Sequence, residues 1–253
     1  MIKNGTICKN IFHERNSYNI QNTCALDSFI FLIGFLANRD KDVNVTISNK
    51  ENLFYSLCRK FSDGCIDTEF YKMRLLAVVS LFAHTEHHTN IMQINSSCTI
   101  QNLIQKMNIQ DFAVKNHTAK HKTHHQTLIC LNSHFQIRDE ERCSCGEDSY
   151  QFGKFVWADI LYVLNDKTFS STTDIKLKSM PKFVQIGKAA LEVMGFVNFI
   201  APTYQTKQNI GHFQALVQKG TNWLCFDDLK DAPCMKNGEM LVSPSVLFLK
   251  NTK

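Results

Sequence analysis

The sequence predicts an α+β fold in which a helical half precedes a β-rich half. Apolar residues recur at helical spacing within residues 51–61 and 67–82. Short runs of β-branched and aromatic residues, separated by turn residues, dominate after about residue 126. Helices and strands that are segregated along the chain are typical of α+β domains. We expect one compact domain over residues 1–253, with a mostly helical half over about 17–125 and a β-rich half over about 126–253.

Length and composition indicate a globular protein and bear on which kinds of partner it has. A chain of 253 residues with 44% apolar and 20% charged residues has the composition of a globular protein. Its net charge of +5 is spread over scattered lysines, so we expect no specific nucleic-acid partner. The longest uncharged apolar run, residues 28–38, is too short to cross a bilayer, so we expect no membrane partner. We also expect a monomer.

The cysteine count bears on the compartment. Residues 1–6 lack the apolar core of a secretory signal. Without such a signal, the ten cysteines read as reduced thiols, metal ligands or a nucleophile and not as a disulfide framework. We therefore expect the protein in the cytoplasm or the nucleus.

A continuously apolar segment, residues 24–38, follows a polar, turn-like stretch and predicts a buried helix. Cys24 stands at the junction. A thiol in the first turn of a helix feels the positive end of the helix dipole, which favours the thiolate, so we expect a lowered pKa. These are the properties of a cysteine nucleophile. The alternative is that Cys24 is simply one of ten cysteines, packed as a small apolar side chain.

The remaining elements follow from periodicity and turn residues. Residues 1–18 look like an irregular lead-in. Helices are expected over residues 51–61, 67–82 and 99–107, the second with Asp67 or Thr68 as its N-cap. Strands are expected at residues 127–131, 151–157, 159–164, 182–186, 193–199, 212–217, 223–226 and 245–249.

Residues 210–228 predict a β-hairpin whose tip lies at Gly220. His212 opens its first strand and Asp227 closes its second. Because the two ends of a hairpin are neighbours, these side chains can meet although 15 positions separate them (227 − 212). A histidine held by a carboxylate is an oriented general base. The alternative is a strand-end histidine beside two solvated acids.

Two motifs resemble a known family. Residues 19–28, with the pattern Asn-x4-Cys-Ala-Leu-Asp-Ser, resemble the Cys box of the ubiquitin-specific proteases, which are papain-like cysteine peptidases. Residues 211–228, with Gly-His-Phe-x9-Trp-Leu-Cys-Phe-Asp-Asp, resemble their His box. Residues 180–186 and 240–249 are similar to two core strands of the same family. The two boxes occur in the family's order.

The resemblance implies a fold, an activity and a set of roles. The helix that begins at Cys24 would be central and packed on a C-terminal antiparallel sheet. The activity would be that of a cysteine isopeptidase and thiolesterase that removes ubiquitin or a ubiquitin-like modifier from lysine side chains. Its partners would be that modifier and its conjugates. By this resemblance Cys24 would be the nucleophile, His212 the base and Asp227 the acid that orients the base. Asn19 would be the oxyanion donor, and Asp228 a supporting acid.

Details of the two boxes leave alternatives open. Asp27 and residues 227–230 are similar to the SUMO isopeptidase branch, so the modifier could be SUMO. Gln21 replaces a glycine of the family's Cys box, and residues 109–112 are a poor match to its Gln/Asp/Glu box. These departures favour a further alternative, a catalytically inactive module that binds a ubiquitin-like protein.

Metal ligands form a separate question. Cys143 and Cys145 resemble half of the zinc ribbon found in the family. A structural zinc site needs four ligands, and no second close pair follows, although Cys130 or His134 could add one. We therefore expect no cofactor and keep these two cysteines as weak zinc candidates. The histidines within residues 84–88 and 117–125 are expected in solvated loops.

Overall fold

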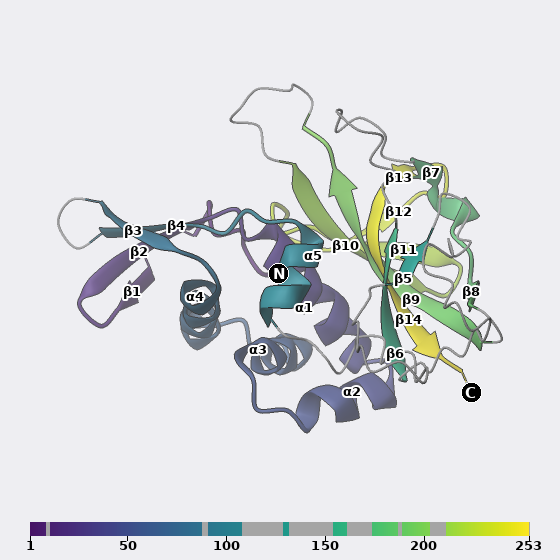
Figure 1. The fold of residues 1–253 in the computed structure, drawn as a ribbon, viewed down its shortest axis with the longest axis horizontal. Coiled ribbons are helices and arrows are strands. Elements are labelled where there is room, and N and C mark those ends of the chain that lie inside the picture. The colour runs from purple at the N-terminus through teal and green to yellow at the C-terminus, as the bar shows by residue number, and fades with distance from the viewer. Residues whose placement is uncertain are drawn as a thin grey trace, which may run out of the picture. The chain divides into compact units, whose positions relative to one another are not determined.

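A computed structural model describes residues 1–8, 11–87, 91–107, 129–131, 154–160, 174–186, 189–202 and 211–252. Contacts divide the chain into two compact units, whose elements are labelled in Figure 1. Unit 1 comprises residues 1–108 and 199–236, and unit 2 comprises residues 109–198 and 237–253. The predicted catalytic residues all belong to unit 1.

Helix α1 (Cys24–Ala37) is the core of unit 1, and thirteen of its fourteen residues are buried. The buried helix expected over residues 24–38 is thus confirmed. The ring of Phe31 lies 5.2 Å from that of Phe61 and 5.5 Å from that of Phe226, and the latter two rings lie 6.2 Å apart. Such aromatic pairs add to the stabilisation from burial. They fix α1 firmly between a helix and a strand.

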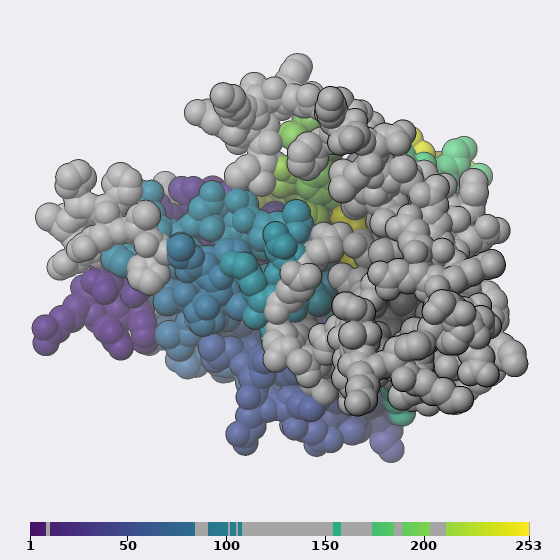
Figure 2. Space-filling view, viewed as in Figure 1, coloured from purple at the N-terminus to yellow at the C-terminus, as the bar shows by residue number. Residues whose placement is uncertain are grey.

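Four further helices belong to unit 1: α2 (Lys41–Ser48), α3 (Leu53–Ser62), α4 (Thr68–Leu81) and α5 (Ile100–Met107). Asp67 caps α4 as expected, because its Oδ1 accepts the N–H of Phe70 at 2.8 Å. Helix α2 was not expected, since its alternating β-branched residues are typical of a strand. The side chain of Asp40 caps it, and it lies on the surface at the lower edge of Figure 2.

Unit 1 also contains a four-stranded sheet in the order β1-β2-β4-β3. The first two strands precede α1, and the other two lie between α4 and α5. Its strands are β1 (Ile11–His13), β2 (Asn16–Gln21), β3 (His84–His87) and β4 (Ile91–Asn95). The expectation of an irregular lead-in over residues 1–18 is therefore wrong, as is that of a loop at His84 and His87. In β2 only Tyr18 and Ile20 are buried, so the strand carries too few apolar residues to be recognised.

The expected hairpin is confirmed, with β10 (His212–Lys219) paired antiparallel to β11 (Asn222–Phe226). Gly220 turns the chain at the tip with φ +65°, a conformation that glycine adopts without strain. Strand β12 (Cys234–Lys236), which was not expected, pairs with the other edge of β11. Helix α1 packs on β10.

Unit 2 is built on a sheet in the order β8-β9-β14-β6-β5. Its strands are β5 (Ile129–Leu131), β6 (Phe155–Ile160), β8 (Phe183–Ile186), β9 (Ala189–Ile200) and β14 (Pro244–Asn251). All pair antiparallel except β5 with β6. Strand β6 runs through position 158, where a break was expected. The short strands β7 (Ile175–Lys176) and β13 (Leu241–Val242) pair with each other, and a 3-10 turn (Leu177–Ser179) follows β7.

Several expectations fall on residues that the structure does not describe: Cys143, Cys145, His134, residues 109–112 and the histidines within residues 117–125. Within the part of the chain that is described, no helix is both long and apolar enough to cross a membrane.

Candidate functional site

The turn before Cys24 places the thiol at the start of α1. Gln21 ends β2, and its carbonyl oxygen accepts both the N–H and the hydroxyl of Ser96, at 3.0 and 2.6 Å. Asn22 takes the left-handed conformation, with φ +60°. Asparagine tolerates this region better than most residues. The missing glycine at position 21 therefore introduces no strain, because the turn's positive φ lies one residue later.

Cys24 is 6% exposed, and its electrostatic surroundings differ from the expectation. Burial, together with the nearby carboxyl groups of Asp228 and Asp27, raises the pKa of the Cys24 thiol to about 12. The backbone N–H groups of Phe213 and Ala25 act in the opposite direction. The lowered pKa predicted from the helix dipole is thus wrong: desolvation outweighs the helix start, so the resting sulfur is a protonated thiol.

Phe213 links the Cys box to the His box. It follows His212 directly in β10, and its backbone N–H lies close enough to the Cys24 sulfur to lower the pKa of that thiol. Gly211 precedes them, and a Cβ atom there would lie 2.1 Å from the Phe199 ring and 3.0 Å from the carbonyl oxygen of Ile200. Glycine at this position lets the chain enter β10 with His212 beside the start of α1.

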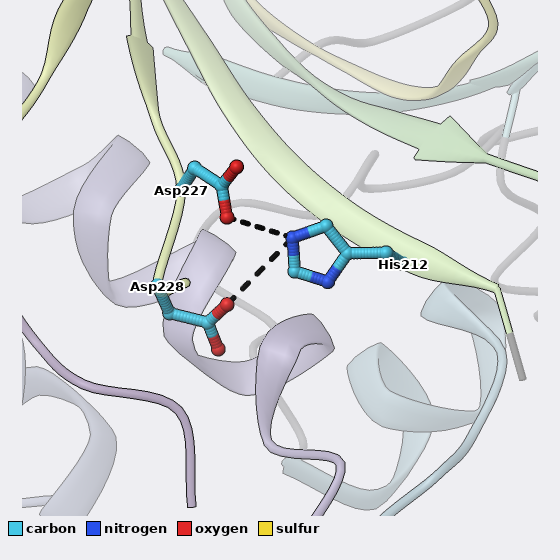
Figure 3. Close-up of side chains that lie close together, drawn as sticks. All are labelled: His212, Asp227 and Asp228. Carbon is cyan, nitrogen blue, oxygen red and sulfur yellow. Dashed lines mark hydrogen bonds and ion pairs between the residues drawn. The ribbon is translucent and has the colours of Figure 1, made fainter. Parts of the chain in front are cut away.

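Of the two ring nitrogens of His212, Nε2 is the one that is hydrogen-bonded to an aspartate. Its Nε2 donates a hydrogen bond to Oδ1 of Asp227 at 2.8 Å. Figure 3 shows that the other ring nitrogen points away from both aspartates. An imidazole whose Nε2 carries the proton has a basic Nδ1. The meeting of His212 and Asp227 that the hairpin predicted is confirmed, and the role of His212 as a general base stays a prediction.

Asp227 is nearly buried and multiply hydrogen-bonded. Its Oδ2 accepts from the side-chain amide of Gln214 at 2.7 Å, and its Oδ1 also accepts the N–H of Leu229 at 3.0 Å. Burial opposes ionisation, but the hydrogen bonds from His212, Leu229 and Gln214 hold the pKa of Asp227 below its usual range. Sequence analysis missed Gln214, although alternation along a strand puts it on the same face as His212.

Asp228 has a different environment from its neighbour. Its Oδ2 accepts the side-chain amide of Asn4 at 2.7 Å, while its Oδ1 lies 3.7 Å from Nε2 of His212 (Figure 3). Burial and the carboxyl group of Asp27 raise the pKa of Asp228 to about 9. Asp228 is thus harder to ionise than Asp227, whose Oδ1 accepts the hydrogen bond of the imidazole.

Asp27 and Arg74 form a fully buried ion pair beneath these residues. Nη1 of Arg74 lies 3.0 and 2.8 Å from the two carboxylate oxygens, and the Thr23 hydroxyl donates to the same carboxylate at 2.6 Å. The guanidinium also lies over the Tyr71 ring, 5.0 Å from its centroid. Sequence analysis did not single out Arg74, because nothing in helical periodicity distinguishes a buried arginine from an exposed one.

Asn19, the predicted oxyanion donor, lies in β2 and is half-buried, in register with Gln93 of β4. Its role stays a prediction.

Among the described residues, His212, Asp227 and Asp228 form a group that could hold a metal ion, with ligand atoms within 4.8 Å of one another. Their closeness is accounted for by the His212–Asp227 hydrogen bond. The zinc candidates Cys143 and Cys145 lie outside the described residues.

Comparison with solved structures identifies the fold. A chain in the structure of the SAGA Ubp8/Sgf11/Sus1/Sgf73 DUB module superposes with a TM-score of 0.50 and 12% identity over 91% of this chain. This chain spans 66% of that one, just under two thirds of its length. The chain shares the fold of deubiquitinase domains of the ubiquitin-specific-protease type.

Two weaker likenesses were found. An essential yeast splicing factor has a TM-score of 0.42 and 8% identity, over 90% of this chain and 68% of that one. The MERS-CoV papain-like protease with human ubiquitin has a TM-score of 0.41 and 10% identity, over 97% of this chain and 70% of that one. No family model matches the sequence, and no curated protein matches it.

Proposed function

We propose that this chain is a cysteine isopeptidase that removes ubiquitin or a ubiquitin-like modifier from lysine side chains. The observation that carries the proposal is the 2.8 Å hydrogen bond between His212 and Asp227. The residue after His212, Phe213, has its backbone N–H close enough to Cys24 to lower the pKa of that thiol. A nucleophile, an oriented base and an acid in this order are the parts of a cysteine-protease triad. The shared fold supports the same reading.

The mechanism follows from the resting protonation states. Nδ1 of His212 takes the Cys24 proton as the sulfur attacks the carbonyl carbon of the modifier's C-terminal residue. Because burial raises the pKa of Cys24, the sulfur depends on His212 to take its proton. Asn19 and backbone N–H groups at the start of α1 hold the oxyanion. The imidazolium then protonates the leaving lysine amine, and water hydrolyses the thioester after giving a proton to His212.

Activity-based probes test the proposal directly. Ubiquitin and SUMO vinyl-sulfone probes are incubated side by side with wild type, Cys24→Ala and, as a matched control, Cys65→Ala, which removes an exposed thiol. We expect one probe to add its mass to wild type and to the control but not to Cys24→Ala. With an amide reporter, His212→Ala should abolish turnover and Asp227→Ala should cost less. Asn19→Ala should lower turnover about a hundredfold or more with little change in binding.

A second candidate function is an inactive module that binds the same modifiers. The raised pKa of Cys24 favours it, because a thiol with a pKa of about 12 is a poor nucleophile unless a base takes its proton. If no probe labels wild type, and wild type and Cys24→Ala bind ubiquitin or SUMO equally in calorimetry, the isopeptidase proposal is wrong. Probe choice also decides between ubiquitin and SUMO, the alternative suggested by Asp27 and residues 227–230.

A further inference from the structure

Residues 3–5 cross unit 1 directly beside the candidate site; we call them the strap. The strap is well anchored: Ile2, just before it, is fully buried and Asn4 is 4% exposed. Nη1 of Arg74 donates to the carbonyl oxygen of Lys3 at 2.7 Å. A Cβ atom on Gly5 would lie 2.8 Å from Cγ2 of Thr23. The sequence motifs assign no role to this segment.

On one side, the strap is bonded to the acid end of the hairpin. The backbone N–H of Asn4 donates to the carbonyl oxygen of Asp228 at 3.0 Å, and its side-chain amide donates to Oδ2 of Asp228 at 2.7 Å. These two bonds fix both the backbone and the carboxyl group of Asp228. The remaining oxygen, Oδ1, is buried without a hydrogen-bond partner among the described residues and faces His212 at 3.7 Å.

On the other side, the strap is bonded to the residues just before Cys24. The N–H of Gly5 donates to the Thr23 hydroxyl at 2.7 Å. That hydroxyl in turn donates to the Asp27 carboxylate in the first turn of α1. The consecutive strap residues Asn4 and Gly5 therefore bind two parts of the site: Asn4 binds Asp228, and Gly5 binds Thr23 at the N-terminus of α1.

We propose that the strap is a positioning device for the site, and that Asn4 is a positioning residue that acts through Asp228 on His212. The inference rests on the proposed function and adds a residue to it. Asn4 touches none of the reacting atoms. It holds the Asp228 carboxyl group in a fixed place, and that group borders the imidazole on the side away from Nδ1. Loss of the Asn4 amide leaves the buried Oδ2 of Asp228 without its hydrogen-bond donor, so we expect the Asp228 carboxyl group to move relative to His212.

Epistasis between Asn4 and Asp228 distinguishes positioning from a purely structural role. With an amide reporter, Asn4→Ala should lower kcat about tenfold and leave KM within about twofold, as expected when reacting groups are displaced while substrate contacts persist. In an Asp228→Ala background, Asn4→Ala should cause no further loss of kcat. An equal loss in both backgrounds, or an effect confined to KM, would overturn the proposal.

Two controls separate this effect from destabilisation. Val43→Ala removes a fully buried side chain in α2, which follows the opposite end of α1 from Cys24, and should lower the melting temperature without lowering kcat. Asp231→Ala removes the exposed partner of the Lys3 side chain and should change neither. If Val43→Ala, at an equal loss of melting temperature, reduces kcat as much as Asn4→Ala does, the effect is one of stability and the proposal is wrong.

A readout without turnover keeps the proposal testable if the proposed function fails. The ring signals of His212 are followed by NMR in wild type, Asn4→Ala, Asp228→Ala and the double variant. We expect Asn4→Ala to shift these signals and the double variant to match Asp228→Ala. Unchanged His212 signals in Asn4→Ala would overturn the strap proposal, whereas shifted signals in a protein that no probe labels would leave it standing and refute only the isopeptidase activity.

Discussion

Cys24 shows how burial competes with the helix start at the scale of one residue. The first turn of α1 supplies the positive end of a dipole, yet the thiol is buried beside two carboxyl groups. A dipole effect at a helix end is worth about 0.3–2 kcal/mol, less than the desolvation of a buried ionised group. The Cys24 side chain is therefore held as a neutral thiol.

The raised pKa of the buried Cys24 thiol predicts that the free energy of unfolding depends on pH in the alkaline range. Because the pKa of Cys24 is raised to about 12 in the folded state, the fold binds this proton more tightly than the unfolded chain, whose thiol has a pKa of about 8.5. The stabilisation is complete below the unfolded pKa and is lost as pH rises through the folded one. The free energy of unfolding should therefore fall by up to about 1.4 kcal/mol per pH unit from this thiol.

Urea denaturation at about pH 8 and about pH 11 measures the effect. In Cys24→Ser, which has no thiol to ionise, the loss of stability between the two values should be smaller than in wild type. Cys225→Ser should behave similarly, because burial also raises the pKa of Cys225 to about 12. Equal losses in wild type and both variants would contradict the assignment of neutral buried thiols.

At the scale of elements, the contact between α1 and α3 depends on Gly34. A Cβ atom there would lie 2.8 Å from the carbonyl oxygen of Cys58 and 2.6 Å from Cδ1 of Phe61. The first of these is backbone of the neighbouring helix and cannot turn aside. Glycine in the middle of a helix is unfavourable by about 1 kcal/mol relative to alanine, so the close approach of the two helices outweighs helix propensity.

We therefore expect Gly34→Ala to destabilise the protein by about 1–3 kcal/mol, although alanine is the better helix former. Chemical denaturation measures the change. Val45→Ala, at a 48% exposed position of α2, is the matched control and should stay within about 0.5 kcal/mol of wild type. A Gly34→Ala variant that is more stable than wild type would show that α1 and α3 can move apart at little cost.

At the scale of the whole molecule, the sequence predicted those features that depend on strong local patterns. The apolar run of α1 and the turn at Gly220 predict the helix and the hairpin, and the hairpin alone brings His212 to Asp227. The polar strand β2 and the alternating residues of α2 have weak or misleading patterns. Asn4 and Arg74 escaped notice because their importance arises from contacts with residues distant in the chain, which local patterns do not report.

The metal content is also a property of the whole chain. We predict that folding does not depend on zinc, because Cys143 and Cys145 form a single pair where a structural site needs four ligands. Chelation of freshly purified protein should shift the melting temperature by less than about 2 °C, which corresponds to about 1 kcal/mol or less for a chain of this size. A fall of many degrees that added zinc reverses would contradict this prediction.

Unit 1 is assembled from two stretches of chain with a long insertion between them, and this has a consequence for synthesis on the ribosome. Helix α1 ends at residue 37, but Phe226, which covers part of it, is made 189 residues later (226 − 37). At about 5–20 residues per second, roughly 10–40 s pass before that strand exists. During this interval α1, a helix without a polar face, lacks the strands that cover it in the folded unit, and Cys24 is present without His212 and Asp227. The emerging protein therefore depends on protection from aggregation, and the candidate site is incomplete until β10 and β11 leave the exit tunnel.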